Sequence, residues 1–328
     1  MKILLGSHFF LPSRGGIETA TDLLAREFVT LGHDVRVITQ SEGAGIFPFE
    51  VIRRPGVAEL LRQVKWCEAF LQNNISLQTL WPLLLIRRPL FVTHQTWIAP
   101  GWTRPLKLAV LRLATNLSIS RAIAQALPCS SIQVGNPYDD HVFRELEGKP
   151  RARDLIFVGR LVSDKGADLF LKALAILRQS GVAASTTMAG DGPERRSLEQ
   201  KAEKLGLRES VAFVGSKEPA ELADLLNQHR ILVVPSLWPE PFGIVALEGI
   251  ASGCVVLGSA DGGLPEAIGP CGLTFPNGDA PALASLLQKL LMDPARIAEL
   301  RRGREKHLAI FTRRHIATLY LQTMGALS

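Results

Sequence analysis

The chain has 328 residues, of which 47% are hydrophobic and 21% are charged, and its formal net charge is +6 at pH 7. This length suffices for two domains of about 150 residues each, and the composition argues against long disordered tracts. A basic balance favours an anionic ligand or surface without choosing among phosphate, nucleic acid and anionic lipid, and a merely basic globular protein remains the alternative.

The cysteines and the N-terminus indicate an intracellular protein. Cys67, Cys129, Cys254 and Cys271 form no CxxC pair, and Cys67 and Cys254 lie in apolar segments typical of small core residues. This usage favours a reducing cytosol. The opening MKILLGSHFFLPSRGG lacks the apolar centre and cleavage site of a signal peptide, and the apolar stretch at 80–86 is too short to span a bilayer. We therefore expect a cytoplasmic location.

Strand-like and helical patterns alternate in the first half of the chain. The predicted strands cover residues 2–7, 34–40, 68–74, 89–95, 117–120 and 131–136, and the predicted helices cover 17–32 and 58–66. The first helix stops at Gly32, a typical C-terminal signal. This alternation is typical of a parallel sheet covered by helices on both faces.

A charged stretch, LEGKPRARD at 146–154, interrupts the alternation and is predicted to be a linker. The alternation then restarts, with predicted strands at 155–160, 185–190, 211–215, 231–236 and 255–260 and predicted helices at 167–181, 194–206, 220–229 and 243–253. The fold class is therefore α/β, with two Rossmann-like doubly wound domains at 1–148 and 149–311. Ligands of such sheets bind outside the carboxyl ends of the strands, and a cleft between the two domains is expected.

Three glycine or cation clusters follow predicted strands. Gly15 and Gly16 precede a helix, where paired glycines let a phosphate approach the backbone, although a simple turn is the alternative. Arg160 ends a strand and Lys165 precedes a helix, so together they can form an anion site, and a solvated loop pair is an equal alternative. In GDGP, Gly190 and Gly192 are a weaker signal for close approach of a base or ribose. No GxGxxG is present at the first turn, which disfavours a nicotinamide or flavin site.

The stretch PEPFGIVALE places Glu240 and Glu248 around Gly243, which begins a predicted helix. Paired carboxylates are used in glycoside hydrolysis, so a hydrolytic pair, a ligand clamp and two surface charges are the alternatives. Free N–H groups at the helix start bind phosphate, and Glu248 lies in the second turn. A carboxylate accepts two hydroxyl hydrogen bonds, so this placement favours a clamp on a vicinal diol.

These motifs together resemble the retaining GT-B glycosyltransferases of family GT4. VGRLVSDKG, AGDGP, PSLWPEPFGIVALEGIASG and GGLPEAIG carry the resemblance, with SRGGIE, LSISRA and GNPYDDHVF in the first half. Glu240 and Glu248 match the family's Glu-x7-Glu signature. The resemblance covers nearly the whole chain and implies a GT-B fold whose C-terminal helix, 312–328, packs back on the first domain. It also assigns acceptor binding to the N-terminal domain and nucleotide-sugar donor binding to the C-terminal domain.

The resemblance implies a role for each site residue. Arg160 and Lys165 would bind the donor diphosphate, Glu248 the ribose hydroxyls and Glu240 the donor sugar. Backbone N–H groups of Phe242, Gly243 and Ile244 would contact sugar and phosphate, and Gly16 would approach the phosphate from the other domain. His94 matches the family's histidine near the reacting carbon, although a lone histidine after a strand is often structural.

The same resemblance implies retention of configuration in a metal-independent hexosyl transfer, with no cofactor beyond the nucleotide-diphosphate sugar. Asp139-Asp140 is the weak alternative, a metal site. Rival hypotheses on the same fold are a sugar-nucleotide epimerase, a phosphorylase and a non-catalytic binding protein. The pair of cations with the pair of glutamates disfavours the epimerase and the binding protein, and no feature points to the pyridoxal-phosphate lysine that a phosphorylase would need.

The acceptor is expected to be a glycan or a lipid-linked molecule of cell-surface polysaccharide or glycolipid synthesis. Residues 95–114 mix Trp97 and Trp102 with Arg104, Lys107 and Arg112 on one helical stripe, opposite leucines and a valine. Such a stretch can lie on an anionic membrane, and a surface helix packed on the sheet is the alternative. The basic helical segment near the C-terminus carries no aromatic interleaving and no known module, so nucleic acid is excluded as a partner.

Overall fold

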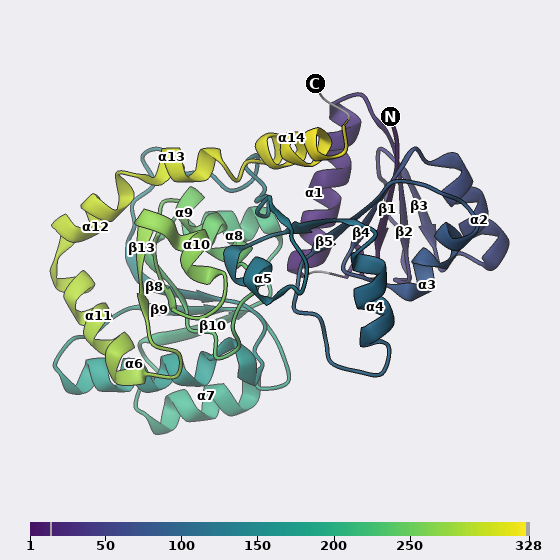
Figure 1. Ribbon diagram of the computed structural model, residues 1–328. Helices are drawn as coiled ribbons and strands as arrows, with labels where there is room; N and C mark the ends of the chain where they lie inside the picture. Colours follow the sequence, from purple (N-terminus) through teal and green to yellow (C-terminus); the bar gives the residue numbers. More distant parts are fainter. Residues whose placement is uncertain (14, 326–328) are drawn as a thin grey trace. The chain divides into compact units, whose positions relative to one another are not determined.

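The computed structural model describes residues 1–13 and 15–325 (Figure 1), and its backbone contacts divide the chain into two units. The N-terminal unit contains Met1–Tyr138 and the segment that starts at Phe311, and the C-terminal unit contains Asp139–Ile310. Each unit holds one parallel sheet, which confirms the predicted α/β class with two doubly wound domains.

The N-terminal sheet has seven strands in the order β3-β2-β1-β4-β5-β6-β7. Its strands are β1 (Lys2–Ser7), β2 (Asp34–Thr39), β3 (Glu50–Arg53), β4 (Ala69–Asn73), β5 (Leu90–His94), β6 (Thr115–Ser118) and β7 (Ile132–Gln133). Its helices are α1 (Gly16–Thr30), α2 (Val57–Trp66), α3 (Leu77–Leu80), the 3-10 turn η1 (Trp81–Leu84), α4 (Arg104–Leu111), α5 (Arg121–Ala126) and α14 (Arg313–Thr323). The strand order reverses between β1 and β4, and ligands of such sheets bind at this reversal.

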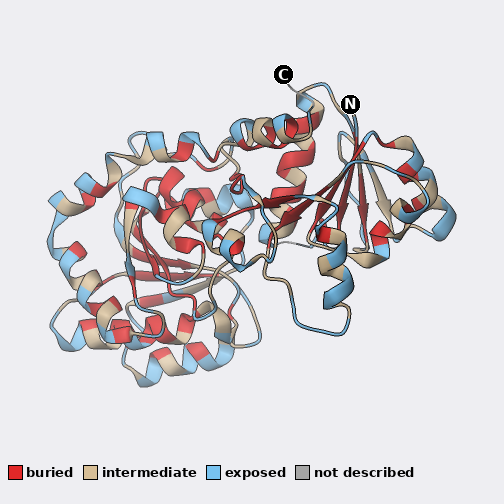
Figure 2. Ribbon diagram, viewed as in Figure 1, coloured by how far each residue is buried: buried red, intermediate tan, exposed pale blue. Residues whose placement is uncertain are grey.

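Apolar runs bury both faces of this sheet. Leu4 of β1 and Phe70 of β4 pack with Leu60 and Val64 of α2, and the central strands β1 and β4 are mostly red in Figure 2, where red marks buried residues. Such runs are typical of parallel strands covered on both sides.

Helix α14 packs on α1 within the N-terminal unit (Figure 1). The ring of Tyr320 lies 6.4 Å from that of Phe28, both side chains are fully buried, and Arg314 pairs with Glu27 at 3.2 Å. The chain therefore returns to its first unit after completing the second, as expected for the C-terminal helix. Residues 326–328 of the predicted helix lie outside the described residues.

The C-terminal sheet has six strands in the order β10-β9-β8-β11-β12-β13. Its strands are β8 (Arg153–Val158), β9 (Thr186–Ala189), β10 (Val211–Gly215), β11 (His229–Val234), β12 (Val255–Ser259) and β13 (Gly272–Phe275). The helices are α6 (Ala167–Gln179), α7 (Arg195–Lys204), α8 (Pro219–Leu226), α9 (Ile244–Ala251), α10 (Leu264–Ile268), α11 (Ala280–Met292), α12 (Pro294–Arg301) and α13 (Arg304–Ala309), with 3-10 turns η2 (Ser163–Lys165) and η3 (Gly269–Cys271). Here the strand order reverses between β8 and β11.

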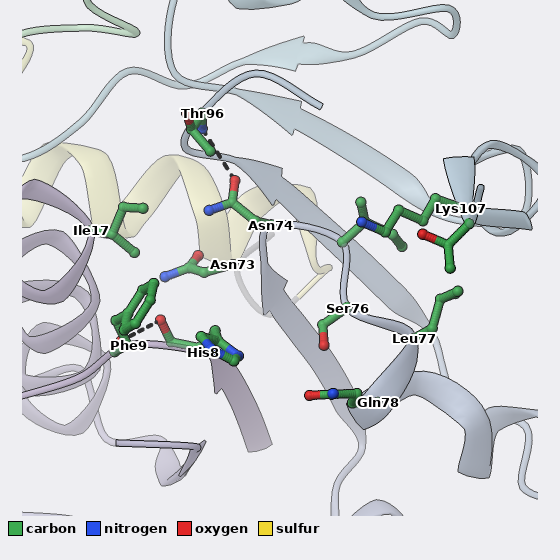
Figure 3. A pocket seen from close by; sticks show the side chains of 13 residues that line it. His8, Phe9, Ile17, Asn73, Asn74, Ser76, Leu77, Gln78, Thr96 and Lys107 are labelled. Atoms are coloured by element: carbon green, nitrogen blue, oxygen red, sulfur yellow. Dashed lines mark hydrogen bonds between the residues drawn. The ribbon is translucent and has the colours of Figure 1, made fainter. Parts of the chain in front are cut away.

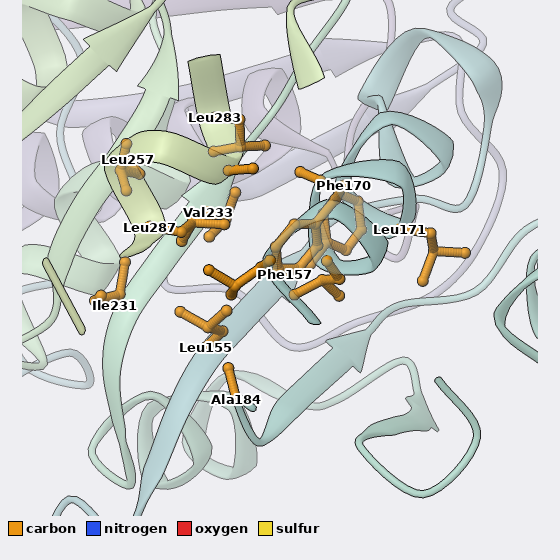
Figure 4. Close-up of a cluster of buried hydrophobic side chains, with 14 of the residues drawn as sticks. Leu155, Phe157, Phe170, Leu171, Ala184, Ile231, Val233, Leu257, Leu283 and Leu287 are labelled. Carbon is orange, nitrogen blue, oxygen red and sulfur yellow. The ribbon is translucent and has the colours of Figure 1, made fainter. Parts of the chain in front are cut away.

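An extensive hydrophobic core of this unit lies on one face of its sheet. Leu155 and Phe157 of β8 pack with Phe170 of α6 and with Leu283 and Leu287 of α11 (Figure 4). Alternate strand residues face α9 on the other side, where Gly249 approaches Leu232 closely. The two faces hold the strands rigidly and leave their carboxyl ends to carry loops.

The unit boundary differs from the prediction at 148/149, because the change of unit falls between Tyr138 and Asp139. The predicted linker is bound to the C-terminal unit. Arg151 donates to the carbonyls of His229 at 2.7 Å and Ser252 at 2.5 Å, and the Leu146 N–H donates to Asn227 at 2.8 Å. Charged residues suggested a solvated segment, but the arginine satisfies backbone carbonyls of its neighbours. The second change of unit falls between Ile310 and Phe311, against a predicted 311/312.

Strands β3 and β13 are absent from the predicted set. Each has four residues and lies at a sheet edge, where polar or glycine residues dilute the apolar pattern. The other predicted strands are confirmed, with boundary shifts of a few residues.

Candidate functional site

The strand reversal in the C-terminal unit brings together residues that follow β8 and β11. After β8 the chain passes the exposed Arg160, forms η2 and begins α6. After β11 it passes Ser236 and Glu240 before α9 begins. The backbone N–H groups of Leu237 and Trp238 both donate to the Asp164 carbonyl, so the two loops are tied together.

Lys165 and Glu240 form an ion pair at this edge. The Lys165 Nζ lies 2.6 Å from the Glu240 Oε1, and their side chains are 25% and 13% exposed. The Ser236 hydroxyl donates to the same oxygen at 2.6 Å. The other oxygen, Oε2, has no hydrogen-bond partner among residues 1–13 and 15–325, so it is an acceptor for a ligand hydroxyl. Lys165, which is predicted to bind the diphosphate, and Glu240, which is predicted to bind hydroxyls of the donor sugar, are therefore in direct contact.

Glu248 lies on α9 in the second turn, as predicted, and is half-buried. Burial and, to a smaller extent, the nearby Asp139 carboxylate together raise the pKa of its carboxyl to about 7. A carboxyl with this pKa changes charge near neutral pH. Phe242 and Ile244 are buried on either side of Gly243, the residue that precedes the first helical residue of α9.

Glycine is required in the loop after β9 because this loop packs closely against the loop after β8. A Cβ on Gly190 would lie 1.8 Å from the Gly159 carbonyl oxygen, and one on Gly192 would lie 2.4 Å from the Leu161 carbonyl oxygen. The Leu161 N–H also donates to the Asp191 carbonyl at 2.8 Å. These contacts explain the residue types of Gly190 and Gly192 by loop packing, and ligand contact at these positions stays a prediction.

The remaining predicted site residues belong to the N-terminal unit. Gly15 precedes α1 and Gly16 is its first residue, and the Glu18 carboxylate lies 2.6 Å from where a Cβ of Gly15 would be. Arg14 of the SRGGIE motif lies outside the described residues. Glu18 accepts a hydrogen bond from Ser13 at 3.3 Å, so an acidic group of the chain itself occupies this helix start.

His94 ends β5 and is buried. Its Nε2 lies 3.0 Å from the Asn116 Oδ1, while the Asn116 amide donates to the Leu111 and Ala114 carbonyls. Asn116 therefore accepts a hydrogen bond from Nε2–H, which assigns the proton to that nitrogen. Burial lowers the His94 pKa and the hydrogen bond to Asn116 opposes this, so the ring is neutral at pH 7.

A cavity of about 440 Å³ opens at the strand reversal of the N-terminal sheet (Figure 3). Its walls come from the loops after β1, β4 and β5 and from the starts of α1 and α4. The lining residues are Ser7, His8, Phe9, Ile17, Asn73, Asn74, Ile75, Ser76, Leu77, Gln78, Thr96, Thr103 and Lys107. None of them was predicted as a site residue. The pair Asn73-Asn74 at the end of the predicted strand 68–74 was the available signal.

Helix α4 departs from the predicted basic stripe. Lys107 lines the cavity, whereas Arg104 is exposed. The exposed fractions are 93% for Trp102, 58% for Leu106 and 87% for Leu113, so these apolar side chains are not packed on the sheet. Of the helices in the described residues, none has the length and apolar character that a membrane crossing requires.

Within residues 1–13 and 15–325, no cluster of three or more His, Cys, Asp or Glu side chains is arranged as a metal site, and this includes the pair Asp139-Asp140. Cys67, Cys254 and Cys271 are buried free thiols, and Cys129 is a half-buried one. Burial raises the pKa of Cys67 to about 11.

Comparison with known families and curated proteins gives consistent matches. A model described as glycosyl transferases group 1 matches residues 140–307. The chain is 37% identical to glycogen synthase of Mycobacterium tuberculosis (strain ATCC 25618 / H37Rv) over 153 residues, 46% of this chain and 36% of that protein. It is 32% identical over 235 residues to a D-inositol 3-phosphate glycosyltransferase of Thermobispora bispora, 67% of this chain and 51% of that protein. It is 28% identical over 248 residues to 2-deoxystreptamine glucosyltransferase of Streptomyces kanamyceticus, with coverages of 72% and 64%. The chain thus spans between 36% and 64% of the length of these relatives.

Solved structures of similar fold cover the whole chain. HepE of Anabaena, in complex with UDP and glucose, matches with a TM-score of 0.82 at 20% identity and full coverage of both chains. Sucrose-phosphate synthase of Thermosynechococcus elongatus matches with a TM-score of 0.78 at 22% identity, covering 99% of this chain and all of that one. These likenesses show the fold, which is GT-B with two Rossmann-like units.

Proposed function

The chain belongs to the glycosyl transferases group 1 family, and on this premise we propose that it transfers a hexose-type sugar from a nucleotide-diphosphate sugar to a glycan or lipid-linked acceptor. The observation that carries the proposal is the Lys165–Glu240 ion pair at the strand reversal of the C-terminal sheet, followed directly by α9 and Glu248. The C-terminal unit thereby contains Lys165 as a cation, Glu240 as a hydrogen-bond acceptor for sugar hydroxyls, the N-terminus of α9, and Glu248 as a hydrogen-bond acceptor for a diol.

In the proposed reaction, the bond between the sugar C1 and the diphosphate oxygen breaks while an acceptor oxygen bonds to C1. Negative charge then develops on the departing diphosphate, and Arg160, Lys165 and the N-terminus of α9 are the groups assigned to stabilise it. The acceptor proton passes to the departing phosphate on the same face, so configuration is retained as in family GT4. The two cations supply the positive charge, and this scheme requires neither a metal nor another cofactor.

Glu240 and Glu248 bind hydroxyls in this scheme and do not attack the sugar. The free Oε2 of Glu240 accepts from the donor sugar, and Glu248 accepts from the ribose. The neutral His94 ring is assigned to the sugar near the reacting carbon. Gly15 and Gly16 are assigned to the donor phosphate, together with the N–H groups of Phe242, Gly243 and Ile244. We assign the enzyme to cell-surface polysaccharide or glycolipid synthesis in the cytoplasm, with the apolar residues Trp102, Leu106 and Leu113 against an anionic membrane.

A panel of nucleotide diphosphates and sugar nucleotides tests the proposed donor. We expect one sugar nucleotide, present at 100 times its Kd, to stabilise the protein by about 2.7 kcal/mol and raise its melting temperature. Incubating that donor with glycan and lipid acceptors then tests transfer, with the anomeric configuration of the product read by NMR. A panel in which no sugar nucleotide raises the melting temperature contradicts the proposal.

Donor affinity is expected to depend on pH through Glu248. The pKa of this carboxyl is about 7 in the folded protein, and the ionised form accepts both ribose hydroxyls. The Kd of the donor should therefore fall as pH rises from about 6 to 8 and should become constant at higher pH. Titration calorimetry with a sugar nucleotide measures this, because its diphosphate diester does not change charge in that range.

Glu248→Gln is the control, since an amide does not titrate, and its donor Kd should be independent of pH. The stability of the unliganded protein should depend on pH in the opposite sense to donor affinity: affinity rises with pH, whereas stability falls. Protonated Glu248 is favoured in the folded state, so its contribution to the free energy of unfolding falls as pH rises from the ordinary value of 4.5 through about 7. If the donor Kd depends on pH in the same way in the parent and in Glu248→Gln, the assignment of Glu248 to the ribose is wrong.

A further inference from the structure

The cavity of the N-terminal unit presents neutral hydrogen-bonding groups beside apolar surface. The Asn74 Oδ1 accepts from the N–H groups of Gln95 at 2.8 Å and Thr96 at 3.1 Å. These two hydrogen bonds fix the orientation of the Asn74 side-chain amide, which lines the cavity. The Asn73 amide donates to Thr21 at 2.6 Å, while its buried Oδ1 has no partner within the described part of the chain. Phe9 and Ile17 lie on the opposite wall from Leu77 (Figure 3). Carboxamides beside apolar side chains suit a hydroxylated ring, whose edge is polar and whose faces are apolar.

The charges of the cavity wall have one sign. Of the thirteen lining residues none is an aspartate or glutamate, and Lys107 is the lysine among them. Lys107 is half-buried, and no carboxylate of the described residues pairs with it. Glu18, the acidic residue at the start of α1, does not line the cavity and accepts from Ser13. A partly buried ammonium without a counter-ion favours an anionic ligand and disfavours a cationic one.

We propose that this cavity binds the acceptor, and that the acceptor is a hydroxylated ring bearing a phosphate group. Lys107 contacts the phosphate, and Asn73, Asn74 and Gln78 contact ring hydroxyls. The inference rests on the proposed transfer reaction and adds the chemical class of its acceptor. The names of two relatives represent the two chemistries in question, an inositol phosphate and the aminocyclitol 2-deoxystreptamine. A wall with a lysine and no carboxylate selects the phosphate and rejects the amine.

Titration calorimetry on the full chain, without donor, tests the acceptor class. The probes are inositol 3-phosphate, inositol, 2-deoxystreptamine and inorganic phosphate. We expect inositol 3-phosphate to bind at least about tenfold more tightly than inositol or inorganic phosphate, and 2-deoxystreptamine to show no binding. Equal affinity for inositol and its phosphate, or tighter binding of the amine, overturns the proposal.

Lys107→Gln should weaken inositol 3-phosphate binding by about tenfold to a hundredfold, the effect of removing a charged hydrogen bond. Lys65→Gln on α2 is the matched control, because it removes the same charge from an exposed residue that lies outside the cavity. Unchanged affinity in Lys107→Gln overturns the assignment of the phosphate to Lys107.

Two further experiments identify the source of the phosphate and distinguish failure of this inference from failure of the proposed function. Vesicles of phosphatidylcholine with and without phosphatidylinositol show whether the phosphate belongs to a lipid headgroup or to a free polyol; binding of either supports the shared chemistry. The melting temperature with sugar nucleotides, measured on the same variants, tests the proposed function separately. Donor binding without phosphate selectivity contradicts this inference alone, whereas phosphate selectivity without donor binding contradicts the proposed function alone.

Discussion

Lys165→Met is expected to reduce kcat/KM for sugar transfer by about a hundredfold to a thousandfold, the usual effect of removing one group that stabilises developing negative charge. Methionine keeps the length of the side chain and removes its charge. Stability should also fall, because the Glu240 carboxylate, whose side chain is only 13% exposed, would lose its ammonium partner and keep the hydrogen bond from Ser236. Steady-state kinetics and a thermal melt on the same sample separate the two effects.

Lys172→Met is the control for Lys165→Met. Lys172 lies on α6 and forms an ion pair with Asp168 at 2.9 Å, away from Glu240, and its side chain is 54% exposed. It should retain the parental rate. Glu240→Gln breaks the Lys165 ion pair from the other side, so the double variant should lose less than the product of the two single effects. A parental rate in Lys165→Met would contradict the assignment of Lys165 to the departing diphosphate.

Gly166→Ala is expected to lower the free energy of unfolding by about 3–5 kcal/mol, which is at the upper end for a single substitution. Gly166 has φ +70°, and a Cβ there would lie 1.8 Å from the Pro235 carbonyl oxygen. Backbone atoms cannot move aside as a side-chain end can. The clash would separate the loops after β8 and β11, and calorimetry should show a melting temperature lower by about 10 °C.

Gly278→Ala isolates the backbone part of this effect. Gly278 has φ +78°, but nothing lies within 4 Å of a Cβ placed there. It should therefore lose only the 1–2 kcal/mol that a left-handed conformation costs an alanine. Similar losses for the two variants would mean that the loops tolerate separation, and that the close contact of Gly166 with Pro235 contributes little to stability.

The sheets and most helices were predictable because their information is local. Buried parallel strands give apolar runs, as at β1, β8 and β12, and each run is followed by a helical period. The edge strand β3 has too few apolar residues to give such a signal. The predicted unit boundary was wrong because its position depends on tertiary contacts. Arg151 has the character of a solvated residue in the sequence, but it donates hydrogen bonds to backbone carbonyls in the C-terminal unit.

The site was predictable as a set of residues and not as a set of contacts. Arg160, Lys165, Glu240 and Glu248 were named from motifs, but the direct pairing of Lys165 with Glu240 joins positions 75 residues apart. The effect of Asp139 on the Glu248 pKa likewise depends on tertiary structure. The cavity around Lys107 escaped prediction because its walls come from five short segments, none of which has a recognisable pattern alone.

The position of α14 also constrains how the protein can fold during its synthesis. Tyr320 completes the packing around Phe28 on α1, yet residues 139–310 form the other unit and are made in between. Helix α1 ends at Thr30 and α14 begins at Arg313, so at about 5–20 residues per second α1 waits on the order of fifteen to sixty seconds on the ribosome before α14 is synthesised. The C-terminal unit is continuous in sequence and can fold as soon as it emerges. The unit that begins first is thus the one that is completed last.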